Sequence, residues 1–366
     1  MNMEANEIIV NYDGKPLYKI ISSNDFLRLS QLIVDLKMED RRFFIVTDDN
    51  VSKYYLEPVI ESIQQVSKTI EYIILPAGEK NKNLDTVNQC YEKLIENNFD
   101  RNDVLIALGG GVVGDLTGFV AATYLRGVRF IQIPTSLLAM VDSSIGGKTG
   151  VDYNSYKNMV GSFHQPSLVY MNLETLTTLP DREYYSAMAE IIKHGLISDY
   201  KYFIWLISRS IEILSKNYDV VKEMIARSCI IKKEIVERDP KEAGERALLN
   251  FGHTIGHSIE KLKEFTVLHG ECVAIGMVAS AYISYSRDYI DKKEYDRILK
   301  TLQVYHLPTK IDNLTAEEIY QVTKLDKKMD SNNIKFILLK KPGQAFIDTS
   351  ISKEELIESI QSVIKR

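Results

Sequence analysis

The sequence predicts an α/β N-terminal domain with a largely parallel sheet, followed by a mostly α-helical C-terminal domain. Two observations predict this fold class. Apolar strand-like segments alternate with amphipathic helical segments up to about residue 133, and helical periodicity takes over after Pro180. The 366 residues suffice for two domains of ordinary size, each with its own core. We therefore expect domains over 1–180 and 181–366.

The N-terminal half begins with two short strands predicted within 7–22, on either side of the turn Asp13-Gly14. Helices are expected from about Phe26 and over 84–96, and further strands over 43–47, 71–75, 104–108 and 130–133. In a parallel sheet with helices on both faces, ligands bind beyond the carboxyl ends of the strands. The polar segments 48–50, 79–82 and 109–115 all lie at that edge.

A glycine run, GGGVVGD, follows the strand over 104–108. Three glycines let backbone N–H groups approach a phosphate, and a helix expected over 115–125 points its positive end there. Tight turns also need glycine, and the spacing is not GxGxxG, so an ordinary dinucleotide dehydrogenase fits poorly. Asp48 or Asn50, at the end of an earlier strand, suits the ribose hydroxyls of an adenine nucleotide. The alternative is that this segment only caps a helix.

Residues 134–166 are predicted to form a long loop rich in glycine and charge. Apolar residues on either side of its charged centre favour an ordered loop over a disordered one. Lys148, Lys157 and Asn158 are candidate anion ligands, with solvated loop charges as the equally weighted alternative.

The C-terminal half is predicted to be helical over 182–196, 201–216, 220–238, 248–263, 270–288, 293–304, 316–324 and 353–365. One hairpin interrupts the helices, with strands over 335–339 and 345–348.

Three of the six histidines lie between residues 246 and 271. His253 and His257 are four apart, so on a buried helix both rings share one face, and His269 follows beyond a loop. Such a set suits a divalent metal, although one or two could be hydrogen-bonded core histidines. Glu190 sits among apolar neighbours, so its carboxylate must be paired or metal-bound. Glu190 with two histidines would leave open positions, as in catalytic zinc sites.

Composition narrows the classes of function. The net charge of −5 argues against a nucleic-acid surface but leaves room for a local basic pocket. Cys90, Cys229 and Cys272 are far apart, which predicts a reducing compartment and no disulfide framework. With no secretory leader and no membrane-spanning stretch, we expect a cytoplasmic protein with no membrane partner.

Several long blocks resemble the 3-dehydroquinate synthase family, among the sugar-phosphate cyclases: GGGVVGDLTGFVAATYLRGVRFIQIPTSLLAMVDSSIGGKTGVD, KNMVGSFHQP, MAEIIKHG and LLNFGHTIGHSIE with LHGE. They occur in the family's order across most of the chain. The resemblance implies a Rossmann-like NAD-binding domain and a helical metal domain, with the active site in the cleft between them. It also implies a homodimer.

The resemblance assigns site residues as follows. The metal, zinc or cobalt, would be bound by Glu190, His253 and His269, which leaves His257 for the substrate phosphate. NAD would contact Asp48, Asn50, Glu79, Lys82, Gly111, Val112, Asp115, Thr135, Ser136, Asp142, Lys148, Lys157 and Thr178. Substrate would contact Arg126 (from the neighbouring subunit), Lys148, Asn158, Lys193, Lys232, Arg246, Asn250, His257 and Lys327 or Lys328. Asp142, Lys148, Lys193, Asn250 and His257 would be catalytic.

The reaction implied is that of a cyclising carbon–oxygen lyase in the shikimate pathway to aromatic amino acids. It converts 3-deoxy-D-arabino-heptulosonate 7-phosphate to 3-dehydroquinate and phosphate. The implied steps are, in order, transient oxidation by NAD, phosphate elimination, reduction and intramolecular aldol closure. The alternatives are another sugar-phosphate cyclase and, more remotely, a metal-dependent polyol dehydrogenase. Asn250, and Lys232 with Arg246 as carboxylate partners, favour the carboxylated substrate.

Overall fold

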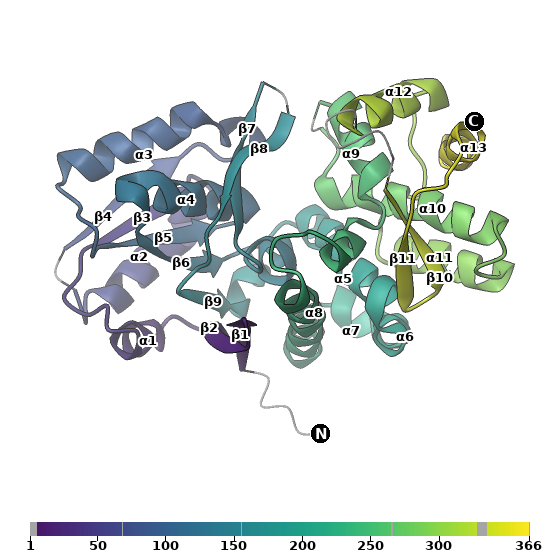
Figure 1. Cartoon of the computed structure of the whole chain (residues 1–366). Helices are drawn as coiled ribbons and strands as arrows, with labels where there is room; N and C mark the ends of the chain where they lie inside the picture. The colour runs from purple at the N-terminus through teal and green to yellow at the C-terminus, as the bar shows by residue number, and fades with distance from the viewer. Residues whose placement is uncertain (1–5, 68, 155, 265, 328–334, 366) are drawn as a thin grey trace. The chain divides into compact units, whose positions relative to one another are not determined.

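The computed structural model describes all residues except 1–5, 68, 155, 265, 328–334 and 366. The chain divides into two compact units, Met1–Leu179 and Pro180–Arg366 (Figure 1). Each unit has its own buried core. That the first unit binds the cofactor and the second the metal stays a prediction.

The first unit is built on a seven-stranded sheet in the order β1-β2-β9-β6-β5-β3-β4. The strands are β1 (Glu7–Tyr12), β2 (Lys15–Ser23), β3 (Phe43–Asp48), β4 (Ile70–Leu75), β5 (Val104–Gly109), β6 (Arg129–Pro134) and β9 (Leu168–Asn172). Only the hairpin β1–β2 is antiparallel among these neighbouring pairs, which confirms the predicted, largely parallel sheet. Its turn uses Asp13 and Gly14, both at positive φ, as a two-residue hairpin turn requires.

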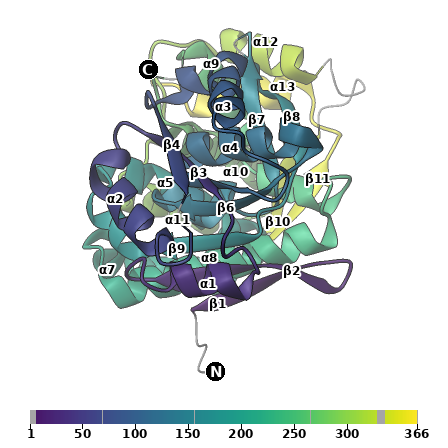
Figure 2. The ribbon, with the colours of Figure 1, turned by 90° about the vertical axis from the view of Figure 1, so that its left-hand side faces the viewer.

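Helices cover both faces of this sheet (Figures 1 and 2). α1 (Leu29–Asp35) and α2 (Ser52–Ile63) pack on one face, and α3 (Leu84–Glu96) and α4 (Gly111–Thr123) on the other. The central strands supply both cores because successive side chains point to opposite faces: Ile45 belongs to one core and Phe44 to the other. Short helical turns complete the unit: η1 (Glu79–Asn81), η2 (Tyr124–Arg126), the π-helix η3 (Ala139–Ser143) and η4 (Leu173–Thr177).

The segment predicted as a long loop, 134–166, is different in the structure. It contains an antiparallel ribbon of β7 (Lys148–Tyr153) and β8 (Tyr156–Phe163). Gly150 and Gly161 face each other in the ribbon, where a Cβ on Gly161 would lie 2.4 Å from the Thr149 carbonyl oxygen. The prediction of a loop was wrong because glycines that permit this close approach look like turn residues in the sequence.

The second unit is mostly helical, and α10 (His269–Ser286) is its central element. It packs against α5 (Asp181–Ser198), α9 (His253–Leu262), α11 (Lys292–Val304), α13 (Lys353–Ser362) and the hairpin of β10 (Phe336–Lys341) and β11 (Gln344–Asp348). The remaining helices are α6 (Tyr200–Ser208), α7 (Ser210–Leu214), α8 (Tyr218–Arg238), η5 (Glu245–Asn250) and α12 (Ala316–Lys327). Helix α10 is apolar on nearly every side, as a helix buried all round must be.

Two predicted helices are each divided in the structure. The helix over 201–216 breaks at Arg209, between α6 and α7. The helix over 248–263 is divided because η5 ends at Asn250; Gly252, at positive φ, then caps α9, which begins at His253.

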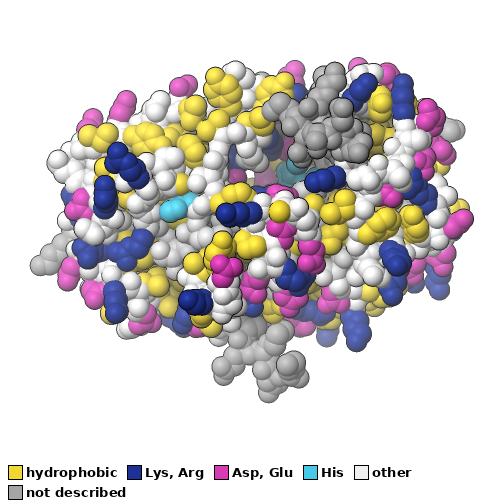
Figure 3. Space-filling view, viewed as in Figure 1, with side chains coloured by type: hydrophobic (Ala, Val, Ile, Leu, Met, Phe, Trp, Pro, Cys, Tyr) yellow, Lys and Arg dark blue, Asp and Glu magenta, His cyan; other side chains and the backbone are white. Residues whose placement is uncertain are grey.

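Charged side chains of both signs are interspersed over the face of the protein in Figure 3. Among the helices that the structure describes, none is both long and apolar enough to cross a membrane.

Candidate active site

The first candidate half-site lies where β5 ends and α4 begins. Gly109, Gly110 and Gly111 make this turn, and no side chain caps the helix among the described residues. The first N–H groups of α4, including those of Gly111 and Val112, therefore remain available to a ligand. A Cβ on Gly111 would lie 3.1 Å from the Ser143 hydroxyl, so glycine keeps the turn open. A diphosphate fits such a helix N-terminus.

Beside this turn is a cluster around the buried ammonium group of Lys82. Its Nζ donates to Asp115 Oδ2 and to Asn158 Oδ1, both at 2.6 Å. Asp152 accepts a hydrogen bond from the Asn158 backbone at 2.8 Å. Burial lowers the pKa of Lys82, but the neighbouring carboxylates, Asp115 first, outweigh it and raise the pKa above its usual value. Lys82 is therefore a permanent cation in the first unit.

Glu79 and Lys157 form a second ion pair at the same edge, at 3.1 Å. This ion pair joins β8 to the turn after β4 and so links the β7–β8 ribbon to the edge of the sheet. Both of its residues were predicted to contact NAD. Lys148 is exposed at the start of β7, and Asp142 lies in the π-helix η3. The structure thus gathers Glu79, Lys82, Asp115, Lys157 and Asn158.

The other predicted nucleotide contacts lie at the end of β3 and just after it, after β6 and after η4. Asp48 accepts hydrogen bonds from the backbone N–H groups of Asn50 and Val51, at 2.9 and 3.0 Å. It therefore does cap the turn into α2, the alternative raised from the sequence, while its second carboxylate oxygen remains for a ligand. Thr135 follows β6 and is buried, Ser136 follows it, and Thr178 hydrogen-bonds the Tyr55 hydroxyl at 2.6 Å. Arg126 is exposed on η2 at positive φ.

The second half-site is organised around Glu190 on α5. The carboxylate is fully buried, and one oxygen, Oε2, pairs with Lys193 three residues along the helix. The other, Oε1, lies 3.6 Å from His253 Nε2 and 3.7 Å from His269 Nε2, and it accepts no hydrogen bond from any described residue. Donors on a tetrahedral zinc ion are roughly 3.4 Å apart. The three groups therefore fit a zinc-sized cation.

Glycines bring these ligands together. A Cβ on Gly276 of α10 would lie 1.9 Å from the Gly252 carbonyl oxygen, which precedes His253. A Cβ on Gly270 would lie 1.9 Å from the carbonyl oxygen of Ser186, one turn before Glu190 on α5. Backbone contact at both places holds the starts of α9 and α10 close to Glu190.

A second group of donors shares His269. His269 Nδ1 lies 3.5 Å from Glu260 Oε2, and His257 completes the group. His257 is exposed, whereas His253 and His269 are half-buried. The i,i+4 pair suggested by spacing therefore does not act together. His253 faces Glu190, whereas the ring of His257 stands edge-on to the ring of His253, with ring centres 5.1 Å apart.

Three cations are buried in the second unit: Lys193 pairs with Glu190, and Lys232 and Arg246 lie on α8 and η5. Lys193, Lys232 and Arg246 are at most 6% exposed. Arg246 donates to the Pro240 carbonyl at 2.7 Å, and Asn250 donates to Glu242 at 3.0 Å. A buried guanidinium and two buried ammonium groups suit an anionic ligand. Lys327 ends α12, and Lys328 lies outside the described residues.

Glu260 was not among the residues predicted from the sequence. The available signal was its spacing: it is seven residues after His253, two helical turns along the same face of α9. Asp152 was also missed, because its role depends on the bend of the ribbon that brings it to Asn158.

The fold, the uncapped start of α4 and the group of Glu190 with two histidines are typical of a class of protein that binds a dinucleotide and a divalent metal. Two solved structures of sugar-phosphate cyclases are similar over nearly the whole chain. A 2-epi-5-epi-valiolone synthase from Streptomyces hygroscopicus, with NAD+ and Zn2+ bound, has a TM-score of 0.87 at 25% identity and covers 94% of this chain and 96% of its own. A 2-deoxy-scyllo-inosose synthase complexed with carbaglucose-6-phosphate, NAD+ and Co2+ has a TM-score of 0.87 at 22% identity, covering 98% and 100%.

Sequence comparison is more specific. The family model described as 3-dehydroquinate synthase N-terminal matches residues 72–186, and that described as 3-dehydroquinate synthase C-terminal matches 187–329. A 3-dehydroquinate synthase from Acetivibrio thermocellus is 41% identical over 343 residues, which cover 94% of this chain and 95% of the relative. The chain belongs to the 3-dehydroquinate synthase family.

Proposed function

We propose that this protein is an NAD- and metal-dependent lyase that converts 3-deoxy-D-arabino-heptulosonate 7-phosphate to 3-dehydroquinate and phosphate. The observation that carries the proposal is the buried Glu190 oxygen facing His253 Nε2 and His269 Nε2, in a chain of this family. The same unit buries three cations, Lys193, Lys232 and Arg246, for an anionic substrate.

NAD would bind the first unit, where it would accept a hydride from the substrate and return it later, so that the cofactor is recycled. Support comes from the uncapped start of α4 for the diphosphate and from Asp48 at the end of β3 for a ribose hydroxyl. Lys82 holds Asp115 and Asn158 in place beside that turn. We assign the remaining NAD contacts to Asn50, Glu79, Thr135, Ser136, Asp142, Lys148, Lys157 and Thr178.

Glu190, His253 and His269 would hold the divalent metal, zinc or cobalt, which would lower the pKa of substrate hydroxyl groups and orient them. Lys193 stays next to Glu190 and offers its remaining donors to the substrate. Arg246 and Lys232 would bind the substrate carboxylate, and Asn250 a hydroxyl group. His257, exposed on α9, would donate to the phosphate. Such prepositioned charges supply binding and orientation.

We further propose a cytoplasmic homodimer. The three cysteines are buried and form no disulfide, as suits a reducing compartment. Met159 and Phe163, on β8, are about half exposed, and apolar side chains two pleats apart on one strand face suit a partner surface. Arg126, exposed on the same unit, would reach the phosphate site of the second copy. Sedimentation velocity should give twice the chain mass, and a monomer would contradict this part of the proposal.

The deciding experiment is phosphate release from 3-deoxy-D-arabino-heptulosonate 7-phosphate, with zinc present and NAD at a small fraction of the substrate concentration. We expect many turnovers per NAD and no accumulation of NADH. Absence of release from a folded, zinc-loaded preparation would overturn the proposal. A Glu190→Gln preparation serves as the inactive control.

A related cyclase activity is the second candidate, because the two similar solved structures are cyclases of other sugar phosphates. Glucose 6-phosphate and sedoheptulose 7-phosphate lack the carboxylate that Arg246 and Lys232 would bind. We therefore expect neither to release phosphate at a comparable rate. A simple polyol that produces stoichiometric NADH would instead identify a dehydrogenase.

A further inference from the structure

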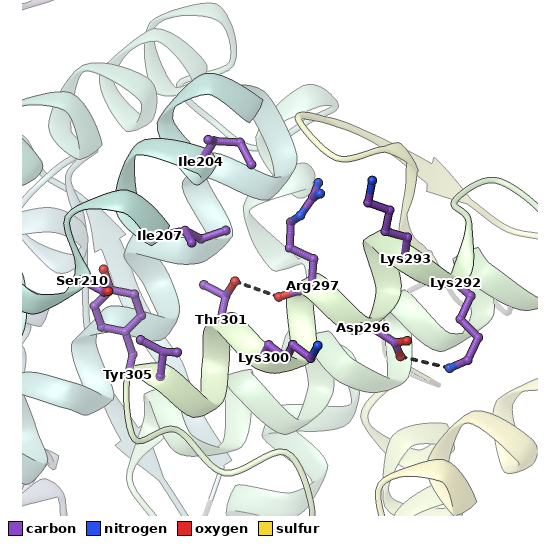
Figure 4. A pocket seen from close by; sticks show the side chains of 11 residues that line it. Ile204, Ile207, Ser210, Lys292, Lys293, Asp296, Arg297, Lys300, Thr301 and Tyr305 are labelled. Carbon is purple, nitrogen blue, oxygen red and sulfur yellow. Dashed lines mark hydrogen bonds and ion pairs between the residues drawn. The ribbon is translucent and has the colours of Figure 1, made fainter.

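A groove of about 660 Å³ lies in the second unit between α6, the start of α7 and one side of α11 (Figure 4). None of the residues proposed for NAD, metal or substrate lines it. Its volume is within the range of small-molecule sites in proteins.

One wall of the groove is apolar. Ile204 and Ile207 of α6 point into it (Figure 4), and Val304 lines it at the end of α11. Ile204 is 38% exposed and Val304 45%, so both leave apolar surface in contact with water. An apolar ligand group would remove that surface from water, which is favourable.

The α11 side of the groove, where Val304 also lies, carries a row of cations, and the carboxylate on this side, Asp296, is paired with Lys292. Lys293, Arg297 and Lys300 follow one another at i, i+4 and i+7 on α11, a row roughly 10 Å long. Arg297 is paired with Glu294, but Lys293 and Lys300 form no ion pair with any described residue. Lys293 also lies in the first turn of the helix, where the helix dipole disfavours a cation. A bound anion would pair with both lysines and would offset the unfavourable interaction of Lys293 with the helix dipole.

We propose that this groove binds a small amphipathic carboxylate, with its acyl or aromatic part against Ile204 and Val304. Its carboxylate would lie over the middle of the row, where the long side chains of Lys293 and Lys300 can both reach it. The row of cations is about as long as such a molecule, whereas a protein helix of several turns would extend beyond it. Charge complementarity and the apolar wall together select an anion with an apolar body over a purely polar one.

The fluorescent probe 8-anilino-1-naphthalenesulfonate, itself an aromatic anion, tests the site in buffer with saturating NAD. We expect one tight class of binding to the wild-type chain, with a Kd at least tenfold weaker in Lys293→Gln/Lys300→Gln and also weaker in Ile204→Asn. The control Lys53→Gln/Lys93→Gln removes two exposed lysines of the first unit and should bind as the wild type does. Octanoate should displace the probe, and 1-octanol should not.

An unchanged Kd in Lys293→Gln/Lys300→Gln would overturn the proposal, as would equal displacement by 1-octanol. The double variant should keep the circular dichroism spectrum and basal phosphate release, because neither lysine belongs to the catalytic or binding machinery described above. If Ile204→Asn does not fold, the charge variants still decide the question.

A second inference concerns Glu260 and rests on the proposed metal site. Glu260 is 3% exposed, and its Oε2 lies 3.5 Å from His269 Nδ1, while Nε2 of the same ring faces Glu190. One carboxylate therefore faces each nitrogen of His269. We infer that Glu260 is a positioning residue, which fixes the ring so that Nε2 is the metal-binding atom.

Chelator competition for zinc tests this role without relying on activity. Glu260→Gln should weaken zinc binding about 10- to 100-fold, and Glu264→Gln, on exposed Glu264 after α9, should not. Wild-type zinc affinity in Glu260→Gln, with Glu190→Gln still defective, would overturn the positioning role alone. Wild-type zinc affinity in both variants would instead contradict the proposed metal site itself.

Discussion

Glu190 is the residue on which the second half-site depends. Its carboxylate pairs with Lys193 through one oxygen and faces two imidazoles with the other. We predict that Glu190→Gln loses the metal, because a neutral amide is a far weaker zinc ligand. Bound zinc per chain, measured by mass spectrometry, should fall to less than a tenth of the wild-type content.

The fold should survive this substitution, since the amide has the same volume and can still accept from Lys193. The circular dichroism spectrum checks it, with Glu212→Gln, at a partly exposed glutamate of α7 that pairs with Arg209, as the control. Wild-type zinc content in a folded Glu190→Gln protein would refute the ligand assignment.

Arg246 is almost fully buried, and its side chain donates to the Pro240 carbonyl. If it binds the substrate carboxylate, Arg246→Ala removes a charge-assisted hydrogen bond worth about 1.5 to 3 kcal/mol. We expect KM to rise by one to two orders of magnitude, with a smaller change in kcat. Steady-state kinetics measure both, and unchanged affinity for the heptulosonate phosphate would count against the carboxylate role.

At the scale of elements, α9 and α10 are held together by glycine. Gly276 faces the Gly252 carbonyl oxygen so closely that a methyl group would overlap backbone. Because backbone cannot move aside as a side chain can, we predict that Gly276→Ala destabilises the protein by about 3 kcal/mol or more. It should also weaken zinc binding, since α9 would carry His253 away. Urea unfolding measures the loss, with Ser286→Ala at the exposed end of α10 as the control, and wild-type stability would contradict the packing argument.

A second contact between elements predicts a pH dependence. Arg287, following α10, binds Glu355 of α13 through two hydrogen bonds of 2.7 and 2.8 Å, which lower the pKa of Glu355 to about 2. Since the folded-state pKa is below the unfolded one, this contact stabilises the protein above about pH 4.5, and the stabilisation is lost as the pH falls toward 2.

The pair is partly exposed, so its contribution at neutral pH is about 1 kcal/mol. Glu355→Gln should lower the free energy of unfolding by that amount at pH 7, and the difference from wild type should shrink at pH 4 and below. Urea titrations at several pH values measure it, and a difference that grows on acidification would contradict the assigned direction.

The sequence predicted those elements whose start, end and periodicity are set by neighbouring residues, and missed those set by tertiary contacts. The helix over 84–96 was predicted with the bounds of α3, because its apolar spacing and Asn83 cap are local. Strand β9 was missed, since its five residues are buried on both faces and show no alternation. The division of α6 from α7 at Arg209 was missed because nothing in the local sequence marks it.

For the molecule as a whole, motif spacing identified the candidate metal ligands. It did not identify which two of the three histidines face Glu190. Spacing paired His253 with His257, whereas the structure turns His253 and His269 toward Glu190. That arrangement depends on where α5, α9 and α10 touch, which Gly252, Gly270 and Gly276 decide through tertiary contacts. The resemblance to a family implied His253 and His269 as the metal-binding pair, which helical spacing alone could not. The groove beside α11 had no sequence signal, because its two walls come from helices about 90 residues apart.

Two compact units, each with its own core and its own proposed ligand site, predict separable effects of the two cofactors on stability. A ligand at a hundred times its Kd stabilises the state that binds it by about 2.7 kcal/mol. In hydrogen-exchange mass spectrometry NAD should therefore slow exchange by roughly a hundredfold in β5 and α4. Zinc should do so at the starts of α9 and α10 and around Glu190. Glu190→Gln should abolish the zinc effect and leave the NAD effect unchanged, whereas zinc protection confined to β5 and α4 would place the metal in the wrong unit.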